Sequence, residues 1–436
     1  MYDIIIIGTG AGGATLSKNL SQKGHKILIL EKGTKQKPGN YIKSIKTKPI
    51  KLKNNLTKEN KKQYSFLKKP LELSYIEELG GTTIASIGNA CFSCSGCYSN
   101  SIMDQFEKQN INLLPELLEA GENLKVKFFP KKYWGKTTKK IAQAGENLGY
   151  EVEPMPKFIN FNKCINCGSC VQGCIANAKW EATQFINQAL NNNTKLKTQF
   201  TVTEIIHENG KIKGVKGTNQ NGKEEYYQSK IVILAAGAIN TPIILKNSGF
   251  NNVGENLFFD MFTTIGGYLK DANLKHELLM GIKAEFGPYF LSPHYSTQLL
   301  PLIQEKGYNI KDTDIVGLML KFADETQGQI QKDGTITKQL TKHDFEIIET
   351  GYDKAIKILT EMGVDNESIV ATSLKGAHPG GTAALGKTVD KNFETKIKGL
   401  YISDASVIPE APGRPPILTI SAISNKVSKI VDANLT

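Results

Sequence analysis

The stretch DIIIIGTGAGGATLSKNLSQKGHKILILEKG, from Asp3 to Gly33, decides the fold of this chain. It opens with a continuous β-branched run, which is typical of a strand buried in a parallel sheet. A glycine-rich turn and a helical segment follow, and a second apolar strand runs from His25 to Gly33. This order of elements predicts a βαβ unit of about thirty residues.

Three glycines of the turn have the G-x-G-x-x-G spacing of a dinucleotide site, namely Gly8, Gly10 and Gly13. The first permits the tight turn, the second lets a pyrophosphate approach the backbone, and the third lets helix and strand pack closely. The pyrophosphate would lie at the helix N-terminus, where unpaired N–H groups favour anions. Glu31, at the end of the second strand, is expected to accept hydrogen bonds from ribose hydroxyls. These features together predict a dinucleotide-binding domain.

The rest of the chain adds a second type of domain. Residues 227–249 repeat the order of apolar strand and helix, and residues 198–228 alternate and turn at two Asn-Gly steps, which predicts a β-meander. From about residue 263 to residue 372, strands and helices suggest a separate, sheet-based substrate domain. The expected fold class is α/β, a Rossmann-type domain with a smaller sheet-based α+β domain and a cysteine-rich insertion.

The composition fits a globular protein of the cytoplasm. Of the 436 residues, 40% are hydrophobic and 8% aromatic. No apolar run reaches the length of about 18 residues that a membrane span requires. The chain enters a buried strand within its first residues, which leaves no room for a signal peptide. In the cytoplasm, clustered cysteines are more often metal ligands or redox thiols than disulfides.

The formal net charge of +12 is concentrated in two lysine-rich stretches. Residues 35–69 contain twelve Lys and one Glu, and residues 125–140 contain seven Lys and no acid. We interpret them either as solvated segments or as a docking surface for an acidic partner, such as a small electron carrier, or for a membrane face. Nucleic acid is not an expected partner, because the basic run lacks a recognition helix and an aromatic platform.

The seven cysteines occur in two runs. The first run has the C-x2-C-x2-C-x3-C spacing of bacterial ferredoxins and consists of Cys164, Cys167, Cys170 and Cys174. The second run is shorter and consists of Cys91, Cys94 and Cys97. Three interpretations stay open: one [4Fe–4S] cluster on the first run, two clusters or one that draws on both runs, and zinc or redox thiols. A cluster would let electrons leave one at a time, to a ferredoxin-like carrier or a partner subunit.

Four separated blocks resemble the glucose–methanol–choline (GMC) family of flavin oxidoreductases and occur in that family's order. They are residues 4–33, 80–90, 232–257 and 378–431. The resemblance implies an FAD-binding domain formed by residues 1–110, 195–262 and 372–436. It leaves an iron–sulfur segment over residues 111–194 and a substrate domain over residues 263–371.

The resemblance also implies which residues contact FAD. The glycine turn and Glu31 would hold the pyrophosphate and the adenosine ribose, and Val202 would touch the adenine. The positions expected along the flavin and its ribityl–pyrophosphate chain are Gly81, Thr82, Asn89, Ala236, Gly237, Asp404, Ala405 and Thr419.

His378, in the segment AHPGGT, matches the family's catalytic histidine beside the flavin ring. A histidine suits this role because its ordinary pKa near 6.5 lets it accept a proton near neutral pH. One position departs from the family, since Pro415 stands where a second His or Asn is expected and its side chain has no polar group. Arg414, His294 or Tyr295 would then complete the pair, or the reaction is not simple alcohol oxidation.

The sequence therefore predicts an FAD- and iron–sulfur-dependent dehydrogenase that oxidises a CH–OH group of a small organic substrate. Its electrons would pass to a protein carrier. Pro415 keeps a second hypothesis open, a flavin reductase that saturates a C=C bond or reduces a carbonyl. A third hypothesis is a non-catalytic electron-transfer subunit.

Overall fold

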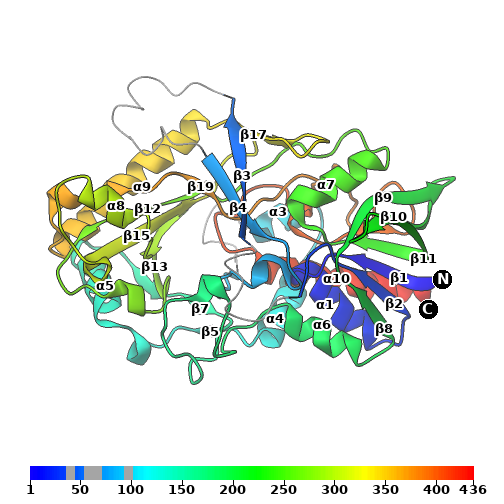
Figure 1. The fold of residues 1–436 in the computed structure, drawn as a ribbon, viewed down its shortest axis with the longest axis horizontal. Coiled ribbons are helices and arrows are strands. Elements are labelled where there is room, and N and C mark those ends of the chain that lie inside the picture. The colour runs from blue at the N-terminus through cyan, green and yellow to red at the C-terminus, as the bar shows by residue number, and fades with distance from the viewer. Residues whose placement is uncertain (36–44, 54–70, 93–101) are drawn as a thin grey trace.

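The computed structural model describes residues 1–35, 45–53, 71–92 and 102–436. Its strands form two large sheets and one short two-stranded ribbon. The first sheet lies at one end of the molecule, and the second extends from the centre to the other end (Figure 1). Most of the lysine-rich stretch 35–69 lies outside the described residues, and so do Cys94 and Cys97.

The first lobe is built on a sheet with the strand order β8-β2-β1-β11-β10-β9, with β20 beside β11. Its parallel strands are β1 (Tyr2–Ile7), β2 (Ile27–Leu30), β8 (Thr194–Lys197), β20 (Leu400–Ile402) and the end of β11 (Glu224–Leu234). Ile4, Ile5 and Ile6 of β1 are fully buried, as a continuous apolar run predicts. The predicted βαβ unit is present, although its second strand begins at Ile27 rather than at His25.

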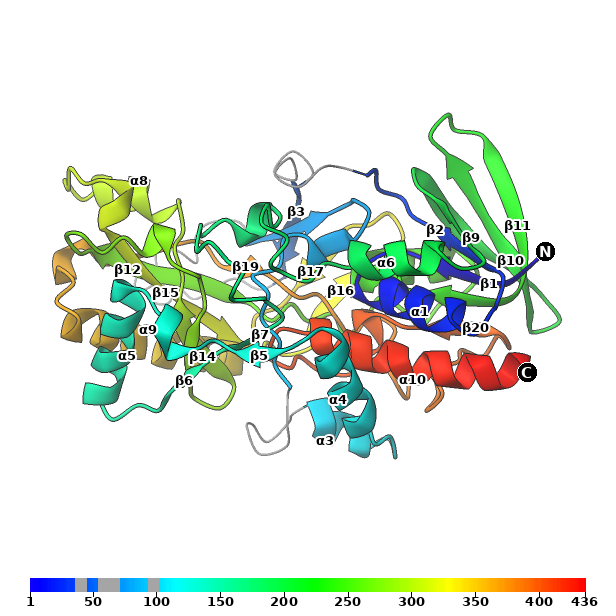
Figure 2. The ribbon, with the colours of Figure 1, turned by 90° about the horizontal axis from the view of Figure 1, so that it is seen from below.

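Helices cover the first sheet and close its hydrophobic core. α1 (Ala11–Ser21) packs against α10 (Ile417–Leu435) and α6 (Thr183–Leu190), as Figure 2 shows. α4 (Leu114–Asn123) packs on α10, and the short α3 (Ile102–Glu107) precedes α4 in the chain. The last helix, α10, therefore packs directly against the first one, α1.

The predicted β-meander is confirmed. β9 (Phe200–Glu208), β10 (Lys211–Asn219) and the first part of β11 pair antiparallel. The turns fall at the two Asn-Gly steps, where Asn209 and Gly210 have φ angles of +50° and +72°. Asn and Gly adopt this left-handed conformation at low cost. α7 (Gly237–Asn247) follows β11, as the sequence predicts.

The second lobe is built on a sheet with the order β16-β17-β3-β4-β19-β12-β15-β14-β13-β6, with β18 beside β12. Its strands are β3 (Ile45–Leu52), β4 (Leu71–Ile76), β6 (Val152–Pro154), β12 (Phe262–Tyr268), β13 (Ile282–Glu285), β14 (Tyr289–Pro293), β15 (Ile315–Phe322), β16 (Gly328–Ile330), β17 (Ile336–Lys338), β18 (Val370–Ala371) and β19 (Lys375–Gly376). α9 (Lys342–Glu361) packs across β12, β14 and β15, α5 (Lys136–Asn147) packs on α9, and α8 (Leu299–Gln304) packs on β12. Within the described ranges, no helix is both long and apolar enough to cross a bilayer.

Strand pairing does not follow the predicted domain boundaries. β3 and β4 come from the predicted FAD-binding domain and β6 from the predicted iron–sulfur segment, yet all three join the second sheet. Residues 111–194 are also not seen as a separate insertion, because α4 and α6 pack in the first lobe and α5 packs in the second. The same segment supplies β5 (Lys127–Phe128) and β7 (Pro156–Lys157), which form the two-stranded ribbon.

A fully buried ion pair connects β17, near one edge of the second sheet, to the end of the more central strand β15. Lys338 Nζ on β17 lies 2.6 Å from Asp324 Oδ2, which follows β15, and both side chains are fully buried. Asp324 also accepts a hydrogen bond from the backbone N–H of Phe259. Replacement of Asp324 by Ala would leave a buried ammonium without its counter-charge.

We predict that Asp324→Ala lowers the free energy of unfolding by about 3–5 kcal/mol, the usual cost of breaking a buried pair. Urea denaturation at pH 7, followed by circular dichroism, measures this loss. The control is Glu346→Ala, which removes an exposed helical partner of Lys342 and should change little. Equal stability of the two variants would contradict the importance of the buried pair.

Candidate functional site

The turn between β1 and α1 is shaped by its glycines. At Gly8, φ is +99° and an added Cβ would lie 2.4 Å from the carbonyl oxygen of Ala235. At Gly13, an added Cβ would lie 2.0 Å from the carbonyl oxygen of Gly8. At Gly10, by contrast, no described heavy atom would lie within 4 Å of it. Gly10 is the N-cap residue of α1, so the open space lies where an anion can meet the helix N-terminus.

Glu31 fixes the shape of this turn from the end of β2. Its carboxylate accepts hydrogen bonds from the N–H and the hydroxyl of Thr9, at 2.9 and 2.6 Å, and from the N–H of Gly33 at 2.7 Å. Burial raises the pKa of Glu31, while these donors lower it. The sequence predicts that Glu31 accepts hydrogen bonds from a ribose. In the structure, the same carboxylate also anchors the glycine turn.

A second loop approaches the same turn. The N–H of Gly80 donates a hydrogen bond to Thr9 Oγ1 at 2.9 Å. Gly81 has a φ of +54°, and an added Cβ there would lie 3.2 Å from the Cα of Gly10. Thr82, in the same short helical turn, is exposed. The structure therefore brings Gly81 beside Gly10, as the resemblance implied.

Asp404 joins two segments that are far apart in the sequence. Its Oδ2 accepts hydrogen bonds from the N–H of Gly237 at 2.9 Å and from the hydroxyl of Thr241 at 2.6 Å. Burial raises the pKa of Asp404. Gly237 begins α7 with a φ of +79° and has no described atom within 4 Å of an added Cβ. Ala236 lies just before it as the N-cap residue.

The other predicted contact residues differ in their surroundings. Val202 is buried on β9, and Ala405 accepts a hydrogen bond from the N–H of Gly381. Thr419, in the first turn of α10, has a buried hydroxyl without a hydrogen-bond partner among the described residues. Asn89 differs, because its amide oxygen accepts from Lys157 Nζ at 2.5 Å and its amide nitrogen donates to Met280 Sδ.

These features fit FAD. Gly10 and Gly237 leave open space at the N-termini of two helices, α1 and α7, where a pyrophosphate would be stabilised. The unpaired hydroxyl of Thr419 offers a hydrogen bond that no described residue takes.

His378 lies next to a buried carboxylate that sequence analysis missed. Its Nδ1 is 3.4 Å from Asp260 Oδ2, and 27% of the His378 side chain remains exposed. Neither of these two atoms has a hydrogen-bond partner among the described residues. Burial and the Lys321 ammonium lower the pKa of His378 to about 4, against the attraction of Asp260. The imidazole is therefore neutral at pH 7.

Asp260 is itself held firmly. It is fully buried, its Oδ1 accepts from the N–H of Gly413 at 2.7 Å, and its carbonyl oxygen accepts from Lys321 Nζ at 2.7 Å. Burial lowers the pKa of Lys321 to about 8. The signal in the sequence was an acid directly after the apolar pair Phe258-Phe259, a position where a charge is buried only with a partner.

Three residues were expected to supply the polar group that Pro415 lacks. In the structure, their described contacts are with residues other than His378. Arg414 donates to Glu285 Oε2 at 3.2 Å and to the carbonyl oxygen of Gly287 at 3.0 Å. His294 Nδ1 lies 2.9 Å from Thr264 Oγ1, and burial lowers the pKa of His294 to about 4. Tyr295 packs against apolar residues of the second lobe. The described partner of His378 is thus Asp260.

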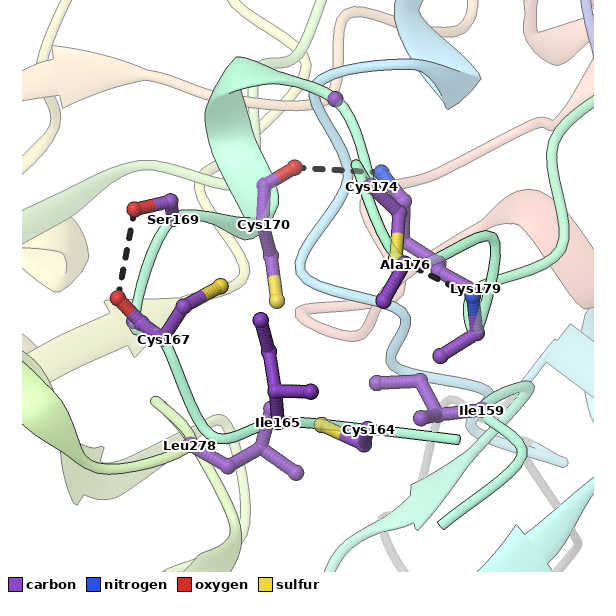
Figure 3. A pocket seen from close by; sticks show the side chains of 13 residues that line it. Ile159, Cys164, Ile165, Cys167, Ser169, Cys170, Cys174, Ala176, Lys179 and Leu278 are labelled. Carbon is purple, nitrogen blue, oxygen red and sulfur yellow. Dashed lines mark hydrogen bonds between the residues drawn. The ribbon is translucent and has the colours of Figure 1, made fainter. Parts of the chain in front are cut away.

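The first cysteine run lines one pocket. Cys164, Cys167, Cys170 and Cys174 surround a common space together with Ile165, Lys179 and Leu278, and Figure 3 shows their sulfur atoms turned toward it. Gly168 permits the loop to turn, since its φ is +68° and an added Cβ would lie 2.1 Å from the carbonyl oxygen of Lys275. Burial raises the pKa of the Cys164 and Cys170 thiols. Cys91 is buried and does not line this pocket.

The described part of the chain contains no group of three or more His, Cys, Asp or Glu side chains arranged to hold one metal ion. Zinc requires ligands about 2.3 Å from a single point. The described side chains thus show no preformed site for one metal ion, and the zinc and iron–sulfur interpretations of the first run both stay predictions. A cubane of four irons is larger and binds each thiolate at a different corner, so it requires sulfur atoms that are farther apart.

Two buried lysines lie close to the cysteine pocket. Lys179 lines it and donates to the carbonyl oxygens of Ile84, Ser86 and Cys170. Lys157 is fully buried and donates to Asn89 and to the carbonyl oxygens of Ile87 and Leu279. Burial lowers the pKa of Lys157 to about 7, while Cys170 and Cys164 raise it. Both ammonium groups thus connect the loop of residues 80–90 to the cysteine pocket.

Comparison with known proteins identifies the family of this chain. Residues 90–262 and residues 335–424, more than half of the chain, match the amino-terminal and carboxy-terminal parts of the GMC oxidoreductases. The chain belongs to the GMC oxidoreductase family.

Similar proteins match nearly the whole chain. An uncharacterised protein of Methanocaldococcus jannaschii is 34% identical over 98% of both chains. A long-chain-alcohol oxidase of Arabidopsis thaliana is 24% identical, and the match covers 100% of this chain and 69% of that protein. The fold resembles that of a mutant Aspergillus oryzae formate oxidase, whose mutation was studied for its effect on FAD modification, with a TM-score of 0.73 at 13% identity over 99% of this chain and 98% of that one.

Several predictions from the sequence are confirmed by family membership. They are the GMC family, the mixed α/β fold and the enzyme class, an FAD-dependent oxidoreductase. Enzyme status does not support the hypothesis of a non-catalytic subunit. The roles of individual site residues and the iron–sulfur cluster stay predictions.

We predict that Gly10→Ala weakens FAD binding by at least about tenfold, because its methyl group would occupy the space left for the pyrophosphate. The FAD content of the purified protein and fluorescence titration of the apo-protein measure this loss. Gly24→Ala is the control, since Gly24 ends the same helix region with a φ of +84° and open space around it. The control should cost stability through backbone strain but keep FAD. Normal FAD affinity in Gly10→Ala would contradict the assignment.

Proposed function

We propose that this GMC oxidoreductase is an FAD- and [4Fe–4S]-dependent dehydrogenase that oxidises a CH–OH group of a small organic molecule. The observation that carries the proposal is the pairing of His378 with the buried Asp260. The segment that follows His378 is tied to the FAD cradle, because Gly381 donates to Ala405, next to Asp404. A proton acceptor thus lies close to the place expected for the flavin.

His378 is suited to accept the alcohol proton at Nε2. Its Nδ1 faces Asp260, which fixes the ring orientation and stabilises the imidazolium that forms. The Lys321 ammonium keeps the imidazole neutral before the reaction. When bound, FAD supplies the acceptor for the hydride, and an iron–sulfur cluster would let electrons leave one at a time. The similarity to a long-chain-alcohol oxidase supports an alcohol as the substrate.

The cysteine pocket supports a cluster rather than reactive thiols. Its four sulfur atoms come from a run with ferredoxin spacing and face one space. The N–H of Ala178 lies 3.2 Å from Cys174 Sγ and donates to it, a contact that stabilises a thiolate. Burial lowers the pKa of both Lys157 and Lys179, and negative charge on the cysteine sulfurs raises it, so an anionic thiolate-bound cluster would favour the charged form of both lysines.

Pro415 favours a second candidate, in which the same site works in the reverse direction. The loop 413–415 passes beside the catalytic pair, since Gly413 donates to Asp260, but residue 415 has no polar side chain to share the proton transfer. A reductase of C=C or C=O groups would receive its electrons through the cluster.

The composition of the oxygen-free purified protein tests both cofactors. We predict about one FAD and about four iron and four sulfide per chain. Addition of alcohols should bleach the flavin band, whereas reoxidation of the photoreduced protein by enones or ketones would support the reductase instead. Colourless protein without iron would contradict the cluster.

We predict that Cys170→Ser loses its iron and keeps FAD, since Cys170 lines the pocket and no FAD contact depends on it. Cys91→Ser is the matched control, because this buried thiol lies outside the pocket. Iron and FAD analysis of both variants measures the effect. Loss of iron in Cys91→Ser as well would favour a cluster that draws on both runs.

We predict that Asp260→Asn lowers kcat by about 10–100-fold, because the amide keeps the shape but no longer stabilises the imidazolium. A neutral His378 is active, so wild-type kcat/KM should be flat above about pH 6 and fall as the pH drops toward about 4. Loss of the carboxylate charge lowers the pKa of His378 further, so the acid limb shifts to lower pH. FAD content and circular dichroism control for folding, and an unchanged plateau would contradict the role of Asp260.

A further inference from the structure

Large apolar side chains are exposed around the mouth of the cysteine pocket. Ile165 is 62% exposed, Ile175 61% and Val171 38%. Ile165 and Val171 lie within the cysteine run and Ile175 follows it directly, while of the three only Ile165 lines the pocket. Single exposed apolar residues need no explanation, but three within eleven residues of a loop that lines a pocket are typical of a contact surface.

Basic side chains adjoin this apolar group. The short helical turn Lys131–Tyr133 lies against the start of the cysteine run, because the Tyr133 hydroxyl donates to Asn162 Oδ1 at 3.0 Å and its ring stacks on Phe161. This turn carries the exposed Lys131 and Lys132, and the run itself carries the exposed Lys163. None of these three lysines forms an ion pair with any described residue.

The carboxylates nearby are used by other partners. Glu181 accepts from the N–H of Cys174 and lies 3.6 Å from Lys179 Nζ. Glu277 is buried and accepts from Thr137 and Thr138. Asp312 pairs with Lys275. The surface around the pocket therefore presents uncompensated positive charge.

We propose that this surface docks an acidic one-electron carrier protein. We call it the rim, and it consists of Ile165, Val171, Ile175, Lys131, Lys132 and Lys163. The proposal rests on the proposed function, since it needs a cluster in the pocket. Transient redox complexes bury small areas, with an apolar centre and charged groups that speed encounter, and the rim has both parts.

The electron balance fits a carrier that takes single electrons. Oxidation of one alcohol to a carbonyl compound releases two electrons and two protons. Two carrier molecules, each reduced by one electron, would leave the rim in each turnover. His378 takes the proton of the hydroxyl group, and the second proton passes to solvent.

The test uses the holoenzyme, photoreduced without oxygen and mixed with an oxidised acidic bacterial ferredoxin in a stopped-flow instrument. We expect the transfer rate to fall about tenfold between about 50 and 500 mM NaCl. Lys131→Gln/Lys132→Gln and Ile175→Ser should each lower it about tenfold at low salt, with iron and FAD unchanged. The control, Lys223→Gln/Lys391→Gln, removes the same charge from exposed lysines of the first lobe and should keep the wild-type rate.

Other outcomes separate the docking proposal from the proposed function. Binding of ferredoxin measured by calorimetry does not require electron transfer, so it tests the rim even in protein without iron. Binding that weakens in the rim variants supports the rim as a docking surface, whereas iron-free protein overturns the cluster and the electron transfer through it. Rates and affinities that do not respond to salt or to the rim variants overturn the docking proposal. Tight binding to phosphatidylserine vesicles without binding to ferredoxin also overturns it, in favour of a membrane.

Discussion

The close contact between the glycine turn and its surroundings determines the geometry of the site. Neither Gly8 nor Gly13 has room for a side chain, so β1, α1 and the end of β11 meet at backbone distance. Two hydrogen bonds, from Thr9 to Glu31 and from Gly80 to Thr9, then hold the loop of residues 80–90 in a fixed position against this turn. Asp404 likewise links α7 to the carboxy-terminal segment, because its carboxylate accepts a hydrogen bond from the N–H of Gly237. The cofactor cradle is thus an assembly of four chain segments that hydrogen bonds hold in register.

The segments with strong local patterns could be predicted from the sequence. The β-branched run of β1, the glycine turn that leads into α1 and the two Asn-Gly turns each have a local physical cause, and the structure contains these elements. The Pro-Gly-Gly segment also predicts His378 as the catalytic histidine, and this role stays a prediction. Local signals of this kind act within a few residues, where backbone conformation and helix period are decided.

Long-range pairing could not be predicted in the same way. Asp260 follows an apolar pair, and only the folded chain shows that its carboxylate meets His378 more than a hundred residues later. Asn89 was assigned to the flavin, but its amide is engaged by Lys157 from a different segment. The second sheet recruits β3, β4 and β6 from regions that the sequence assigned to other domains. In each case the two interacting segments are far apart in the sequence, so no periodic pattern in the sequence indicates their contact.

The strand order of the first sheet has a consequence for the assembly of the protein during synthesis. β1 spans residues 2–7, but its sheet also requires β20, and its helix α1 packs on α10, which ends at residue 435. β1 and α1 are therefore synthesised long before β20 and α10, so the apolar isoleucines of β1 are not fully covered until these late partners have emerged. Contacts across such separations carry a large loop-closure entropy and slow the search. The second lobe can complete most of its pairings sooner, and chaperone protection would matter most for the nascent isoleucine strand.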